Sequence, residues 1–205
     1  RRFMFYGMQF NKDLNFSEHK DILLSDYWKE RSFEGRYLIV KSYFLQKNCG
    51  IDVILQGRDN KSEHKIDTKH DRVVSNNFFL EEYSDRDNKV DGWITKETCY
   101  ADYIYYVFWT GCDKCSEYGN CMKCKKELTA TAYAINYSKL RDWFLKYKDK
   151  YFLIDVMVSK ANGRLVPKEE LIKIFELKKK VFHFNQEEPI VQKALDLFGG
   201  EIVSV

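Results

Sequence analysis

Lys65-Ile66-Asp67-Thr68-Lys69 is the stretch that decides the predicted fold, because charged residues alternate in it with β-branched ones, as in a strand. Side chains two apart on a strand share a face, so Asp67 and Lys69 are expected to project into one cleft. Two further acids sit beside strand-like residues, Asp52 in Gly50-Ile51-Asp52-Val53-Ile54 and Glu81 in Asn77-Phe78-Phe79-Leu80-Glu81. The sequence therefore predicts strands that hold three carboxylates and one ammonium rigidly.

Three carboxylates at one point need a compensating charge. Two ionised carboxylates about 4 Å apart repel by roughly 4 kcal/mol at an effective dielectric near 20, against a typical folding free energy of about 5–15 kcal/mol. A cation, a proton or Lys69 must offset that repulsion. Hard divalent cations bind carboxylate oxygens, polarise phosphoryl oxygens and activate water, and a lysine stabilises developing negative charge. The pattern therefore predicts metal-dependent phosphodiester hydrolysis. Because Asp-x-Lys is a short motif, the alternative is a set of solvated strand-edge or turn residues.

The longer context resembles the PD-(D/E)xK nuclease superfamily, in particular its small phage- and mobile-element-type members. The resemblance covers about residues 30–110. It departs from the family pattern at Asn76, where glycine is expected, at Asp91, where serine is expected, and at Ile51, where the proline of the name would stand. Asp67 stands where glutamate is common. The matching text is Asp67-Thr68-Lys69 with Asp71, Ser75-Asn76-Asn77-Phe78-Phe79-Leu80-Glu81, Asp91-Gly92-Trp93-Ile94 and Ala101-Asp102-Tyr103-Ile104-Tyr105-Tyr106-Val107-Phe108.

This resemblance implies a restriction-endonuclease-like mixed central sheet flanked by helices, and a Mg²⁺- or Mn²⁺-dependent endonuclease that acts on DNA. It also implies a role for individual residues. Asp52 would be the metal-binding acid of the first core strand, and Asp67 would be the second metal ligand. Lys69 would be the catalytic lysine, Glu81 an additional acid near the metal, and the Thr68 carbonyl a further member of the ligand set. Glu34 weakly matches a glutamate that is often found on the helix before the first strand.

A second metal site is predicted in residues 110–127. Two Cys-x-x-Cys knuckles, Cys112 with Cys115 and Cys121 with Cys124, are separated by five residues. Four thiolates at this spacing suit a structural Zn²⁺ in a small insertion. An iron–sulfur cluster, which some nucleases of the superfamily carry, and disulfides or free thiols are the alternatives. The two leftover cysteines and the lack of a visible signal peptide favour a reducing compartment.

The order of apolar runs and breakers predicts a single α/β domain over residues 1–205. Ser17 is expected to cap a helix over 17–31, and the apolar residues of 33–47 favour a buried helix. Strands are predicted at 51–56, 64–69, 78–83, 102–109 and 128–136. Ser138 is expected to cap a helix to about 148, followed by a short apolar run at 151–158, a loop at 163–167, and a helix from Pro167 to near Lys180.

Composition sets the outer limits on the class of protein. The chain has 205 residues, 44% of them hydrophobic, with two prolines and a net charge of +3, which favours a folded domain. Residues 121–180 carry 15 lysines and arginines against 7 acids, which suits a nucleic-acid partner or an ordinary solvated helical face. No apolar run is long enough for a membrane span.

The predicted partner is therefore DNA, without a membrane, in a homodimer or a larger DNA-processing assembly, and in the cytoplasm, nucleoid or nucleus. Two other functions remain open. One is a non-catalytic nucleic-acid- or protein-binding module that uses the zinc knuckle. The other is a subunit of a recombination, repair or restriction assembly whose activity needs a partner.

Overall fold

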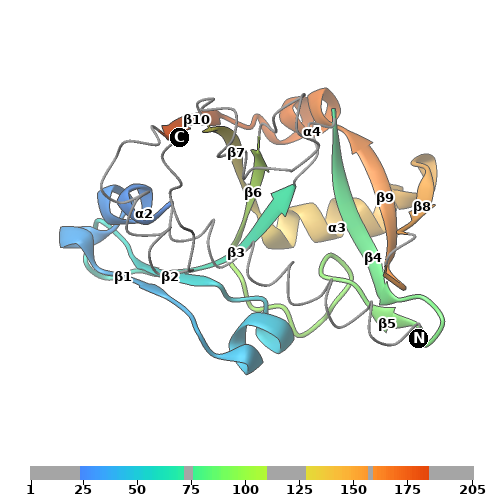
Figure 1. Ribbon diagram of the computed structural model, residues 1–205, viewed down its shortest axis with the longest axis horizontal. Helices are drawn as coiled ribbons and strands as arrows, with labels where there is room; N and C mark the ends of the chain where they lie inside the picture. The colour runs from blue at the N-terminus through green and yellow to red at the C-terminus, as the bar shows by residue number, and fades with distance from the viewer. Residues whose placement is uncertain (1–23, 72–75, 110–127, 157–158, 185–205) are drawn as a thin grey trace, which may run out of the picture.

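The computed structural model describes residues 24–71, 76–109, 128–156 and 159–184. Two β-sheets lie side by side in this part of the chain, with helices around them (Figure 1). The strands of the six-stranded sheet are, in spatial order, β1 (Tyr37–Ile39), β2 (Val53–Gln56), β3 (Glu63–Asp71), β6 (Tyr103–Trp109), β7 (Leu128–Asn136) and β10 (Lys179–Phe184). Those of the four-stranded sheet are β5 (Val90–Asp91), β4 (Asn77–Asp85), β9 (Asn162–Pro167) and β8 (Leu153–Asp155).

The larger sheet is mixed. Strands β3 and β6 are parallel, with Asp67 opposite Ile104, while its other pairs are antiparallel. The described helices are α2 (Ser25–Arg31), α3 (Tyr137–Tyr147) and α4 (Lys168–Phe175), with short 3-10 or π turns at Phe33–Gly35, Phe44–Asn48 and Lys148–Lys150. The α/β class predicted from the sequence is confirmed. None of the described helices is long and apolar enough to cross a membrane.

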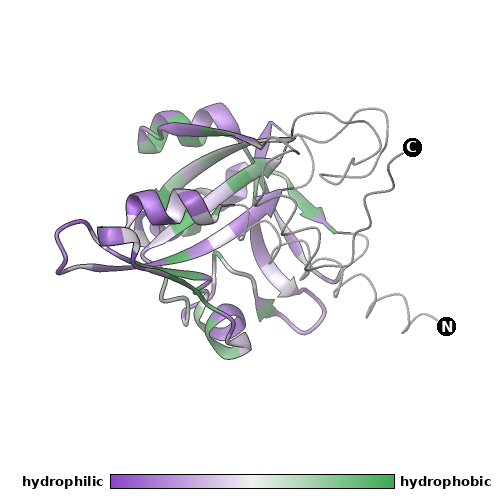
Figure 2. Ribbon diagram, turned by 60° about the vertical axis from the view of Figure 1, so that its left-hand side comes forward, coloured by the Kyte–Doolittle hydropathy of each residue, from purple (hydrophilic) through white to green (hydrophobic). Residues whose placement is uncertain are grey.

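Strand β6 is buried on both faces, and its alternation separates two cores. Tyr105, Val107 and Trp109 face Trp28 of α2. Ile104, Tyr106 and Phe108 face the second sheet together with α3 and α4, where they pack against Phe78, Leu80, Leu140, Phe144, Val166 and Leu171. Hydrophilic and hydrophobic residues both occur along the described strands and helices (Figure 2). Because successive strand side chains point to opposite faces, an unbroken apolar strand must have cover on each side.

The predicted strands at 51–56, 64–69, 78–83, 102–109 and 128–136 are confirmed, with small shifts at their ends. The predicted helix at 138–148 is also confirmed as α3, but its cap is Asn136, whose side chain accepts a hydrogen bond from the Lys139 N–H, and not Ser138. The short apolar run at 151–158 contains strand β8. Of the helix predicted at 17–31, the described part is α2, and its predicted cap Ser17 lies outside the described residues.

The buried helix predicted over 33–47 is wrong. Glu34 has a positive φ of 47°, which helices exclude, and the chain then enters strand β1, which pairs with β2. Leu38 in this strand is 60% exposed, as an edge position permits. The periodicity of a short apolar run does not distinguish a helix from a strand. Residues 37–39 form a strand because β2 is available as a hydrogen-bonding partner.

Two further predictions near the C-terminal end are wrong. Residues 163–167, predicted as a loop, belong to strand β9, which pairs with β4. Gly163 permits this pairing, because a Cβ there would lie 2.5 Å from the Leu80 carbonyl oxygen. The helix predicted to end near Lys180 ends at Phe175, because Glu176 adopts the left-handed conformation that terminates helices. The chain then forms β10 against β7.

Candidate functional site

Asp67 and Lys69 are neighbours on one face of β3. The Lys69 Nζ lies 2.6 Å from Asp67 Oδ1, and the Asp67 side chain is only 2% exposed. Burial raises the pKa of Asp67 well above its ordinary value; Lys69 opposes this effect and Asp52 adds to it. The structure thus keeps a carboxyl group in a position where ionisation costs free energy.

Asp52 approaches the pair from the residue just before β2. Its Oδ2 accepts hydrogen bonds from the backbone N–H of Thr68 at 2.8 Å and from the Thr68 hydroxyl at 3.0 Å. The Asp52 N–H donates to the Ile66 carbonyl at 2.9 Å, which continues the pairing of β2 with β3. Two neighbouring strands therefore place two carboxylates at one point, as the sequence predicts.

Glu81 approaches Lys69 from β4, in the other sheet. Its carboxylate accepts a hydrogen bond from the backbone N–H of Trp93. Burial raises the pKa of Glu81, while Lys69 and the Trp93 N–H act in the opposite direction. Gly92 allows this contact, because a Cβ at that position would lie 2.1 Å from the Glu81 carbonyl oxygen. The loop that follows β5 therefore fits against Glu81 only with glycine at position 92.

Lys69 is the centre of the cluster. Burial alone lowers the pKa of its ammonium, but Asp67, Asp52 and Glu81 outweigh that effect and raise the pKa above its ordinary value. The Nζ also lies 5.4 Å from the centre of the Trp93 ring, within range of a cation–π contact. Lys69 therefore carries a positive charge across the physiological pH range.

The cluster opens into a cleft of about 790 Å³. Asp67, Lys69 and Glu81 line it, whereas Asp52 is not among its lining residues and contacts the site through Thr68. The other lining residues come mainly from the segments before β2 and after β5: Gln46, Lys47, Asn48, Gly50, His70, Phe79, Ser84, Val90, Asp91, Trp93, Lys96, Glu97, Thr98, Cys99 and Tyr106.

Glu34, the remaining predicted site residue, is not brought to the cluster. Its carboxylate pairs with the Arg36 guanidinium at 2.8 Å, and both side chains are mostly exposed. The expected helix before the first strand is a 3-10 turn, Phe33–Gly35, so Glu34 lacks the scaffold on which its predicted position depended.

A divalent cation at this cluster would need several oxygen ligands that converge on one point. Asp67 Oδ2 is fully buried and receives no hydrogen bond from the described residues in their ionised forms; a proton shared with the neighbouring Asp52 carboxyl, or a bound ion, would satisfy it. Carboxylate oxygens suit a hard cation. However, no three His, Cys, Asp or Glu side chains in the described ranges converge closely enough to form a complete ligand set. The carboxylate oxygens are of the type that Mg²⁺ or Mn²⁺ binds, but the described residues do not by themselves converge into a cation site, and the Lys69 ammonium supplies the neutralising charge at Asp67.

The predicted zinc ligands Cys112, Cys115, Cys121 and Cys124 lie outside the described residues. The two other cysteines are free thiols. Cys99 lies beside the site, with its Sγ 2.7 Å from where a Cβ on Gly50 would be. Burial raises the pKa of the Cys99 thiol, so it remains protonated near neutral pH.

Sequence reasoning missed the contribution of the loop after β5. Asp91-Gly92-Trp93-Ile94 contributes to the resemblance, but the sequence pattern predicts no role for Trp93 or Lys96. The available signal was glycine followed by a large aromatic residue, which is typical of close backbone approach. The contact with Lys69 was not predictable, because it joins residues from both sheets.

Comparisons of the chain with protein-family models, curated proteins and solved structures gave no match.

Proposed function

We propose that the chain is a Mg²⁺- or Mn²⁺-dependent endonuclease that hydrolyses phosphodiester bonds in DNA. The observation that carries this proposal is the gathering of Asp52, Asp67 and Glu81 around Lys69 beside a cleft. Burial raises the pKa values of Asp67 and Glu81 beside a specific charge partner in a cleft, which is the arrangement expected of a functional site.

Each residue has a specific part in the proposed reaction. The carboxylates of Asp52, Asp67 and Glu81 and the Thr68 carbonyl would hold the cation, which supplies polarisation of the phosphoryl oxygen and activation of water when bound. Lys69, held between the three acids, presents a fixed positive charge to the negative charge that develops on the phosphate. Asp52 also fixes the β3 backbone through its two hydrogen bonds to Thr68.

Two features of the strand arrangement support a nuclease-like core. The acid before β2 and the Asp-x-Lys pair on β3 lie on neighbouring antiparallel strands. The β3–β6 pair makes the sheet mixed, as the resemblance to the PD-(D/E)xK superfamily implies. The same proposal includes a structural Zn²⁺ bound by the four cysteines of the insertion at 110–127.

A non-catalytic nucleic-acid-binding module is the second candidate. One observation favours it: the Lys69–Asp67 pair already neutralises the buried carboxylate, and no complete cation-ligand set exists among the described side chains. This candidate requires binding that does not depend on divalent ions, whereas the nuclease requires them for turnover.

The first test is a cleavage assay on single-stranded DNA, duplex DNA and RNA with Mg²⁺, Mn²⁺ or EDTA. We expect DNA strand cleavage with either cation and none in EDTA. Binding without cleavage under every condition would refute the enzyme and leave the binding module.

A second test uses the pH dependence of thermal stability. Asp67 and Glu81 have raised pKa values, so their protonated forms stabilise the cation-free fold. That contribution is complete below the ordinary carboxyl pKa of about 4 and is lost as the pH rises through the raised values. A cation binds the ionised forms, so Mn²⁺ is expected to raise Tm more at pH 8 than at pH 5. At about 100 times its Kd, the rise at pH 8 should be about 5–10 °C.

The control for this measurement is Asp67→Asn, which cannot ionise and should lose most of the Mn²⁺-dependent shift. A shift that is equal at both pH values, or that persists in the variant, would place the cation elsewhere.

A further inference from the structure

We propose that the cleft takes an unpaired nucleotide, whose base stacks on the indole ring of Trp93 beside the phosphate that Lys69 faces. This inference rests on the proposed function and adds to it a substrate class, single-stranded or locally unpaired DNA. It also assigns a specificity-determining role to Trp93.

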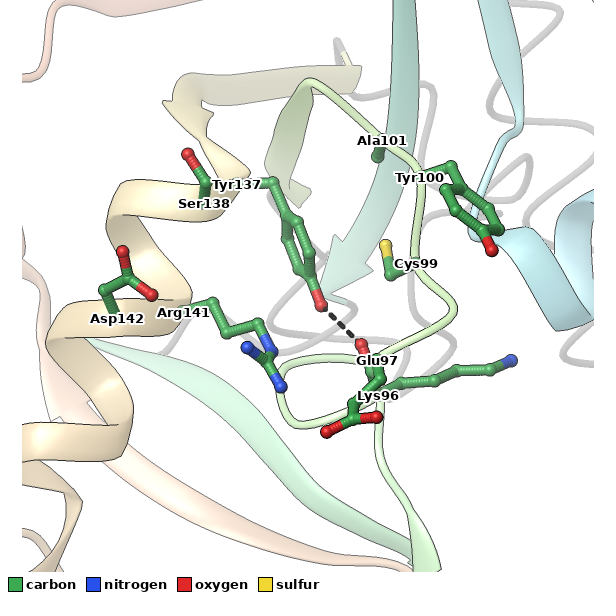
Figure 3. A pocket seen from close by; sticks show the side chains of 9 residues that line it. All are labelled: Lys96, Glu97, Cys99, Tyr100, Ala101, Tyr137, Ser138, Arg141 and Asp142. Carbon is green, nitrogen blue, oxygen red and sulfur yellow. Dashed lines mark hydrogen bonds between the residues drawn. The ribbon is translucent and has the colours of Figure 1, made fainter.

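The loop that carries Trp93 is fixed from several sides. The Trp93 carbonyl accepts a hydrogen bond from the Tyr137 hydroxyl at 3.0 Å, and its N–H donates to Glu81. Tyr137 also donates to the Lys96 carbonyl at 3.1 Å, and Arg141 donates to the Thr95 carbonyl at 3.2 Å. In Figure 3, Tyr137 and Arg141 extend from α3 toward this loop. Such anchoring lowers the entropy lost when a ligand stacks on the indole ring.

The indole ring lies beside the catalytic cluster. Trp93 is half-buried and lines the cleft, together with the half-buried Phe79 of β4. The Lys69 Nζ lies over the indole ring at 5.4 Å from its centre, and the ring also packs against the core that contains Phe78, so a base would meet the part of the indole that lines the cleft. A nucleotide joins a flat base to a phosphate, so one unpaired nucleotide can use both features.

The charge of the cleft argues against a duplex. Among the described lining residues, the three lysines Lys47, Lys69 and Lys96 face the four acids Asp67, Glu81, Asp91 and Glu97. The Lys69 ammonium has three donors, of which one binds Asp67, so it can serve one phosphate, whereas the Lys96 Nζ donates to the Lys47 carbonyl. A protein that makes about 6–10 phosphate contacts with a duplex needs more lysines than line this cleft, whereas one unpaired nucleotide brings a single phosphate. Stacking supplies affinity without net positive charge, and only an unpaired base exposes its face.

The test measures the binding of short labelled oligonucleotides in EDTA, where no cleavage occurs. We expect Trp93→Ala to weaken binding of single-stranded DNA about tenfold and to leave duplex binding unchanged, while Trp93→Phe keeps most of the affinity. Phe152→Ala is the matched control, because Phe152 is 86% exposed and does not line the cleft. Equal weakening of both DNA forms, or no weakening, would overturn the proposal.

A second measurement needs no variant and therefore does not depend on how Trp93→Ala folds. The wild-type chain should bind a single strand that carries abasic sites about tenfold more weakly than the same strand with its bases. Equal affinity would overturn the stacking role. The two proposals fail separately: cleavage without base dependence rejects only the stacking, whereas base-dependent binding without cleavage rejects only the nuclease.

Discussion

Lys69→Met and Asp67→Asn are each expected to reduce Mg²⁺-dependent DNA cleavage by at least about a hundredfold. Loss of one preorganised charged or hydrogen-bonding group at a reacting centre typically costs about 10²–10³ in rate. Lys69→Met removes the ammonium at the centre of three carboxylates, and Asp67→Asn removes the carboxylate with the unpartnered buried oxygen. The measurement is single-turnover cleavage of labelled DNA, with circular dichroism to confirm that each variant is folded.

Asp91→Asn is the matched control for these variants. Asp91 lines the same cleft and is exposed, but it makes no contact with Lys69 in the structure. Its replacement changes the cleft charge by one unit without touching the cluster, so we expect activity within about threefold of wild type. Cleavage at the wild-type rate by folded Lys69→Met or Asp67→Asn would refute the assignment of the site.

Glu82→Ala is expected to lower the free energy of unfolding by about 3 kcal/mol. Glu82 follows Glu81 on β4 and is 5% exposed. Its carboxylate pairs with the Lys148 ammonium and with Arg164 Nε at 2.9 Å. Removal of Glu82 leaves two cations, of which Arg164 is largely buried, without their main counter-charge. Arg164 keeps only its contacts with Asp149 and the Tyr151 carbonyl. Urea denaturation followed by circular dichroism measures the loss.

Glu34→Ala provides the comparison, because Glu34 also pairs with an arginine but in an exposed position. Exposed ion pairs contribute little, so its effect should stay below about 0.5 kcal/mol. If both variants lose the same free energy, burial of the Glu82 network does not set its contribution to stability.

The sequence predicted that Asp52, Asp67 and Lys69 lie close together at neighbouring strands, whereas several of its predictions for the surrounding chain are wrong. The alternation at 65–69 identified the strand and the common face of Asp67 and Lys69, because a period of two is a local property of an extended backbone. Asp52 was placed correctly beside them because only a turn separates its strand from β3. The predicted position of Glu34 is wrong because it depended on a helix before the first strand, and that helix does not form.

The amino-acid sequence alone predicted five strands, at 51–56, 64–69, 78–83, 102–109 and 128–136, and which residues carry the charge, whereas β1, β9 and β10 formed only because partner strands were available to them. Only the tertiary structure decided that β4 leaves the main sheet to pair with β9, and that Glu81 and Trp93 then meet Lys69. The physical reason is that side-chain alternation is encoded within a few residues, whereas strand partners are chosen by burial and hydrogen bonding between segments far apart in the chain.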